Sequence, residues 1–243
     1  KPSSPAQARE AQPRPVMSGL FPVAWLASLA LISLLPAVVY AGTVPDHTPY
    51  LSKCGQLKKA LTDADGLLQF RTQSSVRPSL LFEDPLCPTC KAYHQRVKAE
   101  GIWDRLDVKL ALFPLDNECN WMLDVPLHPG ACTVSKAVIC GKEQALTVLE
   151  WAYDQQEYLT RAGKAGEPVL RAAIQQRWGP NMIQCIDDVQ TKARLNRHLQ
   201  LAVDNAIPVS TPQMYLGSQR VCDEDTDIGL RFTLGKLAPE VLK

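Results

Sequence analysis

The chain has 243 residues, of which 46% are hydrophobic, so it is long enough and apolar enough to bury a globular core. Its net charge is only +1, which argues against a nucleic-acid partner, because recognition of a polyanion needs a basic surface. Eight cysteines are a high count for a chain kept among cytosolic reductants, so we expect an oxidising compartment.

The N-terminal part of the chain predicts a tail followed by a transmembrane helix. Residues 1–19 are rich in Pro, Ser, Ala and Gln without an apolar period, which is typical of a disordered tail. The segment 20–41 has no charged side chain, and a helix of this length covers about 30 Å of hydrocarbon. Arg9 and Arg14 precede it, so the positive-inside rule predicts a cytoplasmic tail and an exported remainder. The alternative is a signal peptide cleaved near Ala41, followed by secretion.

The next part of the chain predicts a β-α-β unit. Residues 42–75 are expected to form a linker and an N-terminal extension, with a helix over Leu51 to Thr62. The apolar run from Pro78 to Glu83 predicts a buried strand, and Lys91 to Arg105 has a helical pattern. The alternation from Asp107 to Phe113 predicts a second strand. A pair of cysteines therefore lies where the first strand ends and the helix begins.

Helical patterns dominate the middle of the chain. They cover three segments: Val134 to Tyr158, Glu167 to Trp178 and Met182 to Ala206. With the irregular stretch before them, these segments predict a helical insertion over about residues 115–206. After the insertion, Gln213 to Gly217 predicts a strand, and Gly217-Ser218 predicts a tight hairpin turn into a further strand.

The cysteine pair is Cys87-Pro88-Thr89-Cys90, at the predicted start of a helix. Thiol–disulfide exchange needs a thiolate nucleophile and a second thiol that resolves the mixed disulfide. The free N–H groups and the dipole of a helix N-terminus stabilise a thiolate, so we expect Cys87 to project outward as the attacking sulfur. Cys90 is expected to be the shielded resolving thiol. Pro88 suits the first helical turn, where a missing N–H is not needed, and Thr89 is the other supporting residue.

Metal and haem sites are alternatives for this motif. A zinc site would need a second Cys-x-x-Cys pair or a Cys–His partner, and the chain has no second pair. His94 follows Cys90 by four residues, but we expect an exposed helix residue there rather than a ligand. A c-type haem needs a His directly after the second cysteine, where this chain has Lys91. We therefore expect no metal.

Two segments resemble a known family. The stretch from Leu80 to Cys90 looks like the active-site segment of DsbA- and DsbC/DsbG-type disulfide oxidoreductases, and Ile207 to Leu216 resembles the segment in which that family places a cis-proline. The resemblance implies an α/β, thioredoxin-like domain over residues 76–243. It also implies that Thr211-Pro212 is a cis bond beside the dithiol, with the backbone of Thr211 pairing to bound peptide as an added strand.

The middle segment sharpens the resemblance. The runs from Phe113 to Asn120 and from His128 to Cys132 look like domains fused to or paired with vitamin K epoxide reductase-type membrane quinone reductases. This implies reoxidation by a membrane partner of that type or of the DsbB type. The quinone would then belong to the partner, the redox-active disulfide would serve without a bound cofactor, and the substrates would be exported protein thiols. His128 itself is expected to be a turn residue.

One position departs from the family pattern. Many thioredoxins and DsbA-type proteins have a buried carboxylate six residues before the first active cysteine, where it serves proton transfer to the resolving thiol. This chain has Leu81 at that position. Glu83 and Asp84 are nearby, but we expect them closer to the loop, and this leaves the proton-transfer group unassigned.

The remaining six cysteines are expected to form structural disulfides. The candidate pairs are Cys119 with Cys132, Cys140 with Cys185, and Cys54 with Cys222. The first pair flanks a short loop with prolines, whose closure contributes about 3 kcal/mol by loop entropy, although a second redox pair is the alternative. The other two pairs are assigned by elimination, since one lies in the helical insertion and the other flanks the core. Six cysteines allow many other connectivities.

These features together predict a membrane-anchored protein that exchanges disulfides with exported proteins through Cys87 and Cys90. A disulfide reductase or isomerase would use the same chemistry, because the reduction potential sets the direction. A copper- or zinc-binding module would hold a soft metal ion with the same thiols. A disulfide-stapled interaction domain would keep Cys87 buried and inert.

Overall fold

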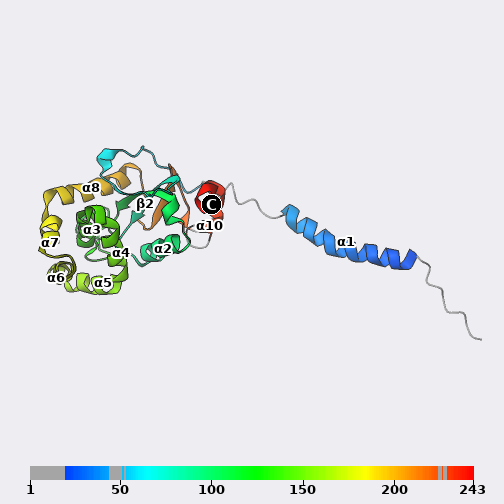
Figure 1. Ribbon diagram of the computed structural model, residues 1–243, viewed down its shortest axis with the longest axis horizontal. Coiled ribbons are helices and arrows are strands. Elements are labelled where there is room, and N and C mark those ends of the chain that lie inside the picture. Colours follow the sequence, from blue (N-terminus) through cyan, green and yellow to red (C-terminus); the bar gives the residue numbers. More distant parts are fainter. Residues whose placement is uncertain (1–19, 44–50, 52, 224–225, 227–228) are drawn as a thin grey trace, which may run out of the picture. The chain divides into compact units, whose positions relative to one another are not determined.

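The structure is a computed structural model that describes residues 20–43, 51, 53–223, 226 and 229–243. It has two units, Lys1–Asp46 and His47–Lys243. In the first unit, α1 (Leu20–Thr43) is a single helix, and its stretch Pro22–Gly42 is long and apolar enough to cross a membrane (Figure 1). A membrane anchor and a signal sequence both meet this criterion. The tail expected over residues 1–19 lies outside the described residues.

The second unit is built on a five-stranded sheet. Its strands lie in the order β1 (Leu68–Phe70), β3 (Leu106–Leu112), β2 (Arg77–Glu83), β4 (Gln213–Leu216) and β5 (Gln219–Arg220). Strands β2 and β3 are parallel and are joined by α2 (Pro88–Ala99), which is the expected β-α-β unit. The other neighbours are antiparallel. The pairing of β2 with β4 brings the segment after the helical insertion beside the strand that leads to the cysteines.

Both faces of the sheet are buried. Leu81 of β2 belongs to the apolar cluster that contains α2 and most inserted helices. Leu80 and Phe82 belong to a second cluster, which contains Leu199 of α8 (Val189–Asp204). Because successive side chains of a strand point to opposite faces, a strand covered on both sides needs a continuous apolar run. This requirement explains why β2 is apolar from Leu80 to Phe82 without alternation.

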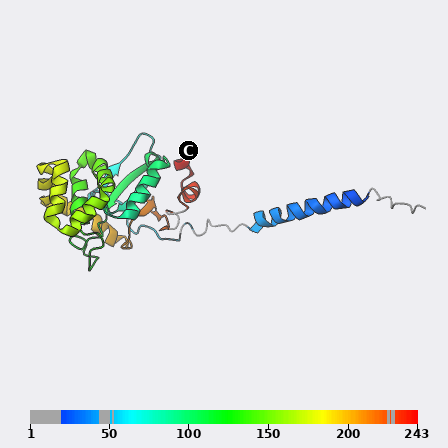
Figure 2. The same cartoon turned by 90° about the horizontal axis from the view of Figure 1, so that it is seen from below.

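Six helices between β3 and β4 form the helical insertion. They are α3 (Ala131–Cys140), α4 (Ala145–Asp154), α5 (Gln156–Ala165), α6 (Glu167–Trp178), α7 (Pro180–Asp187) and α8. Short 3-10 helices lie at Asp63–Asp65, Trp103–Arg105, Lys142–Gln144 and Pro239–Leu242. Most inserted helices gather at one end of the sheet, and α10 (Leu230–Leu237) lies at the other end (Figure 1, Figure 2).

Three expected helices have different bounds. The pattern from Val134 to Tyr158 is divided among α3, α4 and α5, and the first break falls at Gly141, the residue after α3. The pattern from Met182 to Ala206 is divided between α7 and α8, because Asp188 accepts a hydrogen bond from Gln190 N and so caps a new helix. The helix expected from Lys91 to Arg105 ends at Ala99, and a 3-10 turn follows.

The helix expected over Leu51 to Thr62 is wrong. Cys54 is bonded to Cys222, and Gln56 forms a β-bridge with Gln219, so this stretch follows the edge of the β4–β5 hairpin. Its amide groups are used across the hairpin instead of within a helix: Leu57 N, for example, donates to the carbonyl of Ser218 at 2.8 Å. The structure also adds β1 and α10, which the sequence did not predict.

Candidate functional site

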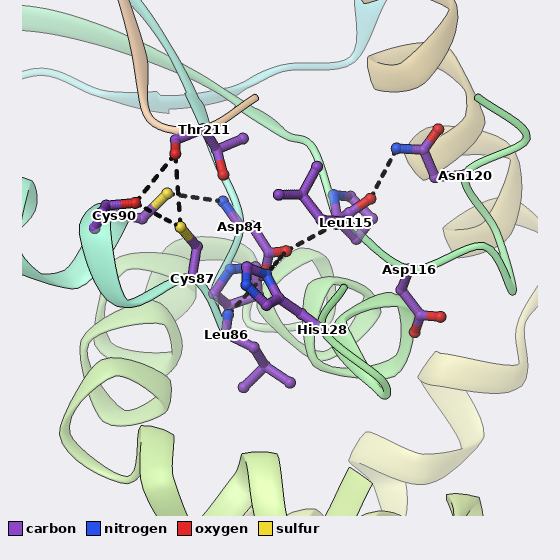
Figure 3. Close-up of polar contacts among 12 residues, drawn as sticks. Asp84, Leu86, Cys87, Cys90, Leu115, Asp116, Asn120, His128 and Thr211 are labelled. Carbon is purple, nitrogen blue, oxygen red and sulfur yellow. Dashed lines mark hydrogen bonds and ion pairs between the residues drawn. The ribbon is translucent and has the colours of Figure 1, made fainter. Parts of the chain in front are cut away.

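The cysteine pair lies where β2 ends and α2 begins (Figure 3). Cys87 is the N-cap residue with extended backbone angles (φ −79°, ψ 121°), and Pro88 is the first residue of the helix. Both Cys87 and Cys90 are free cysteines. Cys90 is fully buried and Cys87 is 4% exposed, so Cys87 is more enclosed than the outward projection expected from the sequence.

Hydrogen-bonding groups surround the sulfur of Cys87. Its Sγ lies 2.9 Å from Thr89 Oγ1 and 3.6 Å from the carbonyl oxygen of Thr211. A hydrogen bond with Cys90 is the largest influence on Cys87, and together with the bonds to Thr89 and Thr211 it outweighs burial and lowers the pKa of Cys87 from 9.0 to about 4. Cys87 is therefore a thiolate at neutral pH.

Cys90 has the opposite character. Its sulfur receives a hydrogen bond from the backbone N–H of Asp84 at 3.4 Å. Burial raises the pKa of Cys90 well above its usual value, and the neighbouring Cys87 raises it further. The environment thus drives the pKa values of the two thiols apart, giving one nucleophile and one thiol that keeps its proton.

The peptide bond between Thr211 and Pro212 is cis, and it comes just before β4. Thr89 Oγ1 donates to the carbonyl oxygen of Thr211 at 3.2 Å, so this segment lies against the dithiol (Figure 3). The hydroxyl oxygen of Thr211 is buried and has no hydrogen-bond partner within the part of the chain that the structure describes. The structure therefore brings the motif residues and the cis-proline segment together, as the family resemblance implied.

Asp84 and His128 form an ion pair that the sequence did not predict. The buried carboxylate of Asp84 accepts hydrogen bonds from Leu86 N (2.7 Å) and Leu115 N (2.8 Å), and lies 2.7 Å from His128 Nδ1. Burial alone would lower the pKa of His128, but the hydrogen bond and charge of Asp84 prevail and raise it. His128 is thus a fixed contact beside the dithiol and not only a turn residue (Figure 3).

Glu83, the last residue of β2, is also fully buried. Burial raises the pKa of Glu83 to about 8, although a 3.0 Å hydrogen bond from the Tyr153 hydroxyl to its Oε2 lowers it. We expected Glu83 and Asp84 closer to the loop, but both lie in the interior. The reason is that the sheet is covered on both faces up to the strand end, which a strand pattern alone does not reveal.

His94 also differs from the expectation of an exposed helix residue. It is 2% exposed, and its ring lies 4.5 Å from the ring of Trp103 and 5.3 Å from that of Tyr153. Its Nε2 lies 3.5 Å from Glu150 Oε1. Among the described residues, no group of three or more His, Cys, Asp and Glu side chains is placed to hold a metal ion.

The other six cysteines form three disulfides, which coincide with the expected pairs: Cys54–Cys222, Cys119–Cys132 and Cys140–Cys185. The second closes the loop that carries His128, and the backbone N–H of Cys132 donates to Asp116 Oδ2 at 3.2 Å. Since these six sulfurs are bonded, Cys87 and Cys90 are the two thiols available for exchange.

No protein-family model matches the chain, and no curated protein matches it in sequence. Similar solved structures include MdbA, a thiol-disulfide oxidoreductase from Corynebacterium matruchotii, which is 9% identical with a TM-score of 0.51 over 76% of this chain and 95% of MdbA. DsbA from Xylella fastidiosa is 18% identical with a TM-score of 0.48 over 66% of this chain and 83% of that one. ScsC from Proteus mirabilis is 15% identical with a TM-score of 0.46 over 89% and 97%.

Three features define the fold of this chain: the sheet, the helix that starts at the dithiol, and the helices inserted between β3 and β4. The likeness to MdbA extends over nearly the whole of that protein. The chain has a DsbA-like thioredoxin fold with an inserted helical subdomain.

Proposed function

We propose that this protein is a thiol–disulfide oxidoreductase that oxidises the thiols of exported proteins through Cys87 and Cys90. The observation that carries the proposal is the contrast between the two sulfurs. Cys87 is stabilised as a thiolate at the start of α2, while the buried Cys90 keeps its proton. Exchange needs a nucleophile and a resolving thiol in contact, and these two cysteines supply both.

The stabilised thiolate favours oxidation of substrates over their reduction. A group whose pKa is lowered from 9.0 to about 4 stabilises the reduced protein at neutral pH, whereas the disulfide form gains nothing from the same contacts. A protein whose reduced form is stabilised is a strong oxidant. A reductase or isomerase is the second candidate: a reductase would need a reduction potential near that of thioredoxin, and an isomerase an intermediate one, as protein disulfide isomerase has at about −180 mV.

Thr211 is proposed to bind the substrate chain. Its carbonyl oxygen lies 3.6 Å from Cys87 Sγ, so a peptide bonded to this sulfur would run beside the segment and can pair with it as an added strand. Such pairing recognises backbone and not sequence, which suits an enzyme that accepts many exported proteins.

The cellular setting is also proposed. α1 would anchor the chain, with the unit His47–Lys243 in the periplasm or outside the cell; secretion after cleavage of a signal peptide is the alternative. A membrane quinone reductase of the vitamin K epoxide reductase or DsbB type would reoxidise Cys87 and Cys90. The chain then needs no cofactor of its own, because electrons leave through thiol–disulfide exchange with that partner.

The proposal is tested by the reduction potential and by trapping. Equilibration with glutathione should give a potential well above the value of about −270 mV that is typical of thioredoxin. Cys90→Ser should trap mixed disulfides with exported proteins, and Cys87→Ser should trap none. Equal trapping by the two variants, or an alkylation pKa near 9 for Cys87, would contradict the proposed roles. A copper- or zinc-binding module would instead hold the metal stoichiometrically with both thiols.

A further inference from the structure

The residues that join β2 to α2 form a turn, and the orientation of this turn places Cys87 (Figure 3). Asp84 and Pro85 suit the first two positions of a β-turn, and the backbone N–H of Cys87 donates to the carbonyl oxygen of Asp84 at 3.0 Å. The carbonyl oxygen of Cys87 then accepts the first hydrogen bond of α2, from Lys91 N at 3.1 Å. The backbone of this turn, Asp84–Cys87, therefore fixes the point from which the reactive sulfur projects.

A side chain of the helical insertion holds the Asp84–Cys87 turn. Gln156, the first residue of α5, is buried. Its Nε2 donates to the carbonyl oxygen of Cys87 at 3.0 Å and to that of Pro85 at 3.4 Å. A carboxamide NH2 group has two hydrogens and a carbonyl oxygen can accept twice, so the carbonyl of Cys87 can accept from Gln156 and from Lys91 together. Gln156 thus joins the insertion directly to the residue whose sulfur reacts.

This contact needs both the length and the donors of a glutamine. The two bonds are buried, so a side chain without donors would remove a partner from two carbonyl groups in the interior. Asparagine carries the same amide on a side chain that is one methylene shorter, and ionised glutamate carries acceptors only. The local sequence does not mark the role, because Gln155 and Gln156 are adjacent and the fold alone shows that the first is exposed and the second buried.

The hold on Cys87 matters most in the reduced protein. In the oxidised protein, the covalent bond to Cys90 fixes the sulfur of Cys87. In the reduced protein this sulfur is free, and hydrogen bonds keep it in place, among them the 2.9 Å contact with Thr89 Oγ1. A hydrogen bond weakens steeply as its geometry departs from the optimum, so a small rotation of the turn weakens these bonds. The lowered pKa of Cys87, about 4, depends on them.

We propose that Gln156 is a positioning residue, which holds the Asp84–Cys87 turn so that the sulfur of Cys87 keeps its hydrogen bonds in the reduced protein. The inference rests on the function proposed above, because it concerns the same exchange reaction. Gln156 contacts backbone carbonyls, so it acts on the sulfur through the position of Cys87. Without the amide, the thiolate loses part of its stabilisation while the disulfide does not. A less stable reduced form makes the protein a weaker oxidant.

The test compares the acidity and the redox equilibrium of the same thiol. Gln156→Met has a side chain of similar length without an N–H donor. Ultraviolet absorbance of the thiolate, followed against pH in the reduced full-length protein, gives the pKa of Cys87. Equilibration with glutathione gives the constant for the reaction in which the protein disulfide and two glutathione thiols yield the protein dithiol and glutathione disulfide.

We expect the acid dissociation constant of Cys87 to fall about tenfold in Gln156→Met, so that its pKa rises. This is less than the complete loss of a hydrogen bond to a charged group gives. The glutathione equilibrium constant at neutral pH should fall by the same factor, which corresponds to a reduction potential lower by about 30 mV. The two factors should agree, because both report the stability that the thiolate has lost.

Gln155→Met is the matched control. Gln155 precedes Gln156 and is exposed, so the same chemical change there should leave both constants at their wild-type values. Gln156→Asn keeps a polar amide and replaces Gln156→Met if that variant fails to fold; its shorter side chain should change both constants in the same direction. Urea denaturation of the oxidised variants measures their stability. A lower stability with both constants unchanged would show a purely structural role and overturn the proposal.

The outcomes also separate this inference from the proposed function. If Cys87 of the wild-type protein has a pKa near 9, or if the protein does not equilibrate with glutathione, the exchange function is wrong. If the wild type behaves as proposed and neither Gln156→Met nor Gln156→Asn changes the two constants, the positioning role is wrong and the function stands. A higher pKa of Cys87 without a fall in the glutathione constant would also overturn the role, because the reduced form would then not depend on Gln156.

Discussion

At the scale of single residues, Asp84 joins the dithiol to the helical insertion. Its backbone N–H bonds to Cys90 Sγ, and its carboxylate accepts from Leu86 N, Leu115 N and His128. A carboxylate with two oxygens that both accept is the side chain best suited to this position. Asp84 therefore fixes the loop beside Cys90, because it accepts hydrogen bonds from Leu86, which precedes Cys87, and from Leu115 and His128, which lie where the helical insertion begins.

Asp84→Asn should destabilise the protein. The amide keeps one accepting oxygen and replaces the other with an NH2 group, so at least one of the three donors loses its partner. We expect a loss of about 1–3 kcal/mol in the free energy of unfolding, the usual cost of a buried unsatisfied polar group. Urea denaturation measures it, with Asp154→Asn on the exposed side of α4 as the control. Equal stability of the two variants would contradict the role of Asp84.

The ion pair of Asp84 and His128 also makes the free energy of unfolding depend on pH. The folded protein raises the pKa of His128 above its ordinary value of 6.5, so the interaction stabilises the fold fully below about pH 6.5 and is lost as the pH rises through the folded value. The difference in unfolding free energy between the wild type and His128→Gln should therefore be larger at pH 6 than at pH 8.5. Titration of groups that do not interact with His128 cancels in this difference, because they are common to both proteins, whereas the pKa of Asp84, which His128 lowers against the raising effect of burial, changes with the substitution. A larger difference at alkaline pH would contradict the assigned direction.

At the scale of elements, close contacts and single capping residues set the positions of the inserted helices, and a periodic apolar pattern does not reveal them. Glu167 to Trp178 was predicted with its observed bounds, because glycines flank it on both sides. The longer patterns were broken where a single residue intervenes: Gly141 follows α3, and Asp188 caps α8. Apolar periodicity continues across such breaks, so a helix pattern shows which face is buried but not where the axis changes direction.

Gly163 of α5 tests one of these contacts. A Cβ at this position would overlap the carbonyl oxygen of Pro129, next to His128, and backbone cannot move aside as a flexible side chain can. Gly163→Ala should cost about 1–3 kcal/mol as an overpacked contact, despite the higher helix propensity of alanine. The substitution should also shift the His128 side chain away from Asp84 and so lower the pKa of His128. An NMR titration of the imidazole measures this pKa.

Gly235 of α10 is the matched control for Gly163. It is also a helical glycine, but among the described residues a Cβ there would meet only Leu242 Cδ1 at an ordinary 3.6 Å. Gly235→Ala should be neutral or stabilising by up to about 1 kcal/mol, as helix propensity alone predicts. If both alanine variants are stabilised, α5 does not hold the His128 loop in the manner described.

At the scale of the whole molecule, the sequence predicted what local patterns and a family resemblance can contain. The Cys87–Cys90 motif and its place after a strand are local, and the cis bond at Pro212 was implied by the resemblance. The pairing of Glu83 with Tyr153 and that of Asp84 with His128 join residues far apart in sequence. Each of these side chains has an unremarkable local context, so one sequence without its fold carries no signal that they meet.

The last prediction concerns the placement of the chain in the membrane. We expect α1 to remain attached, with the tail before it in the cytoplasm and the unit His47–Lys243 outside. The disulfide Cys54–Cys222 supports export, because structural disulfides persist in oxidising compartments.

After mild reduction of intact cells, an impermeant maleimide should label Cys54 or Cys222. A cysteine introduced by Ser4→Cys should react only after lysis, since the positive-inside rule keeps Arg9 and Arg14 inside. Labelling of the Ser4→Cys tail in intact cells would show that the topology is the reverse of the one we expect. A labelled protein that has lost the tail and appears in the soluble fraction would identify α1 as a cleaved signal, leaving the exported dithiol domain free to diffuse to its substrates.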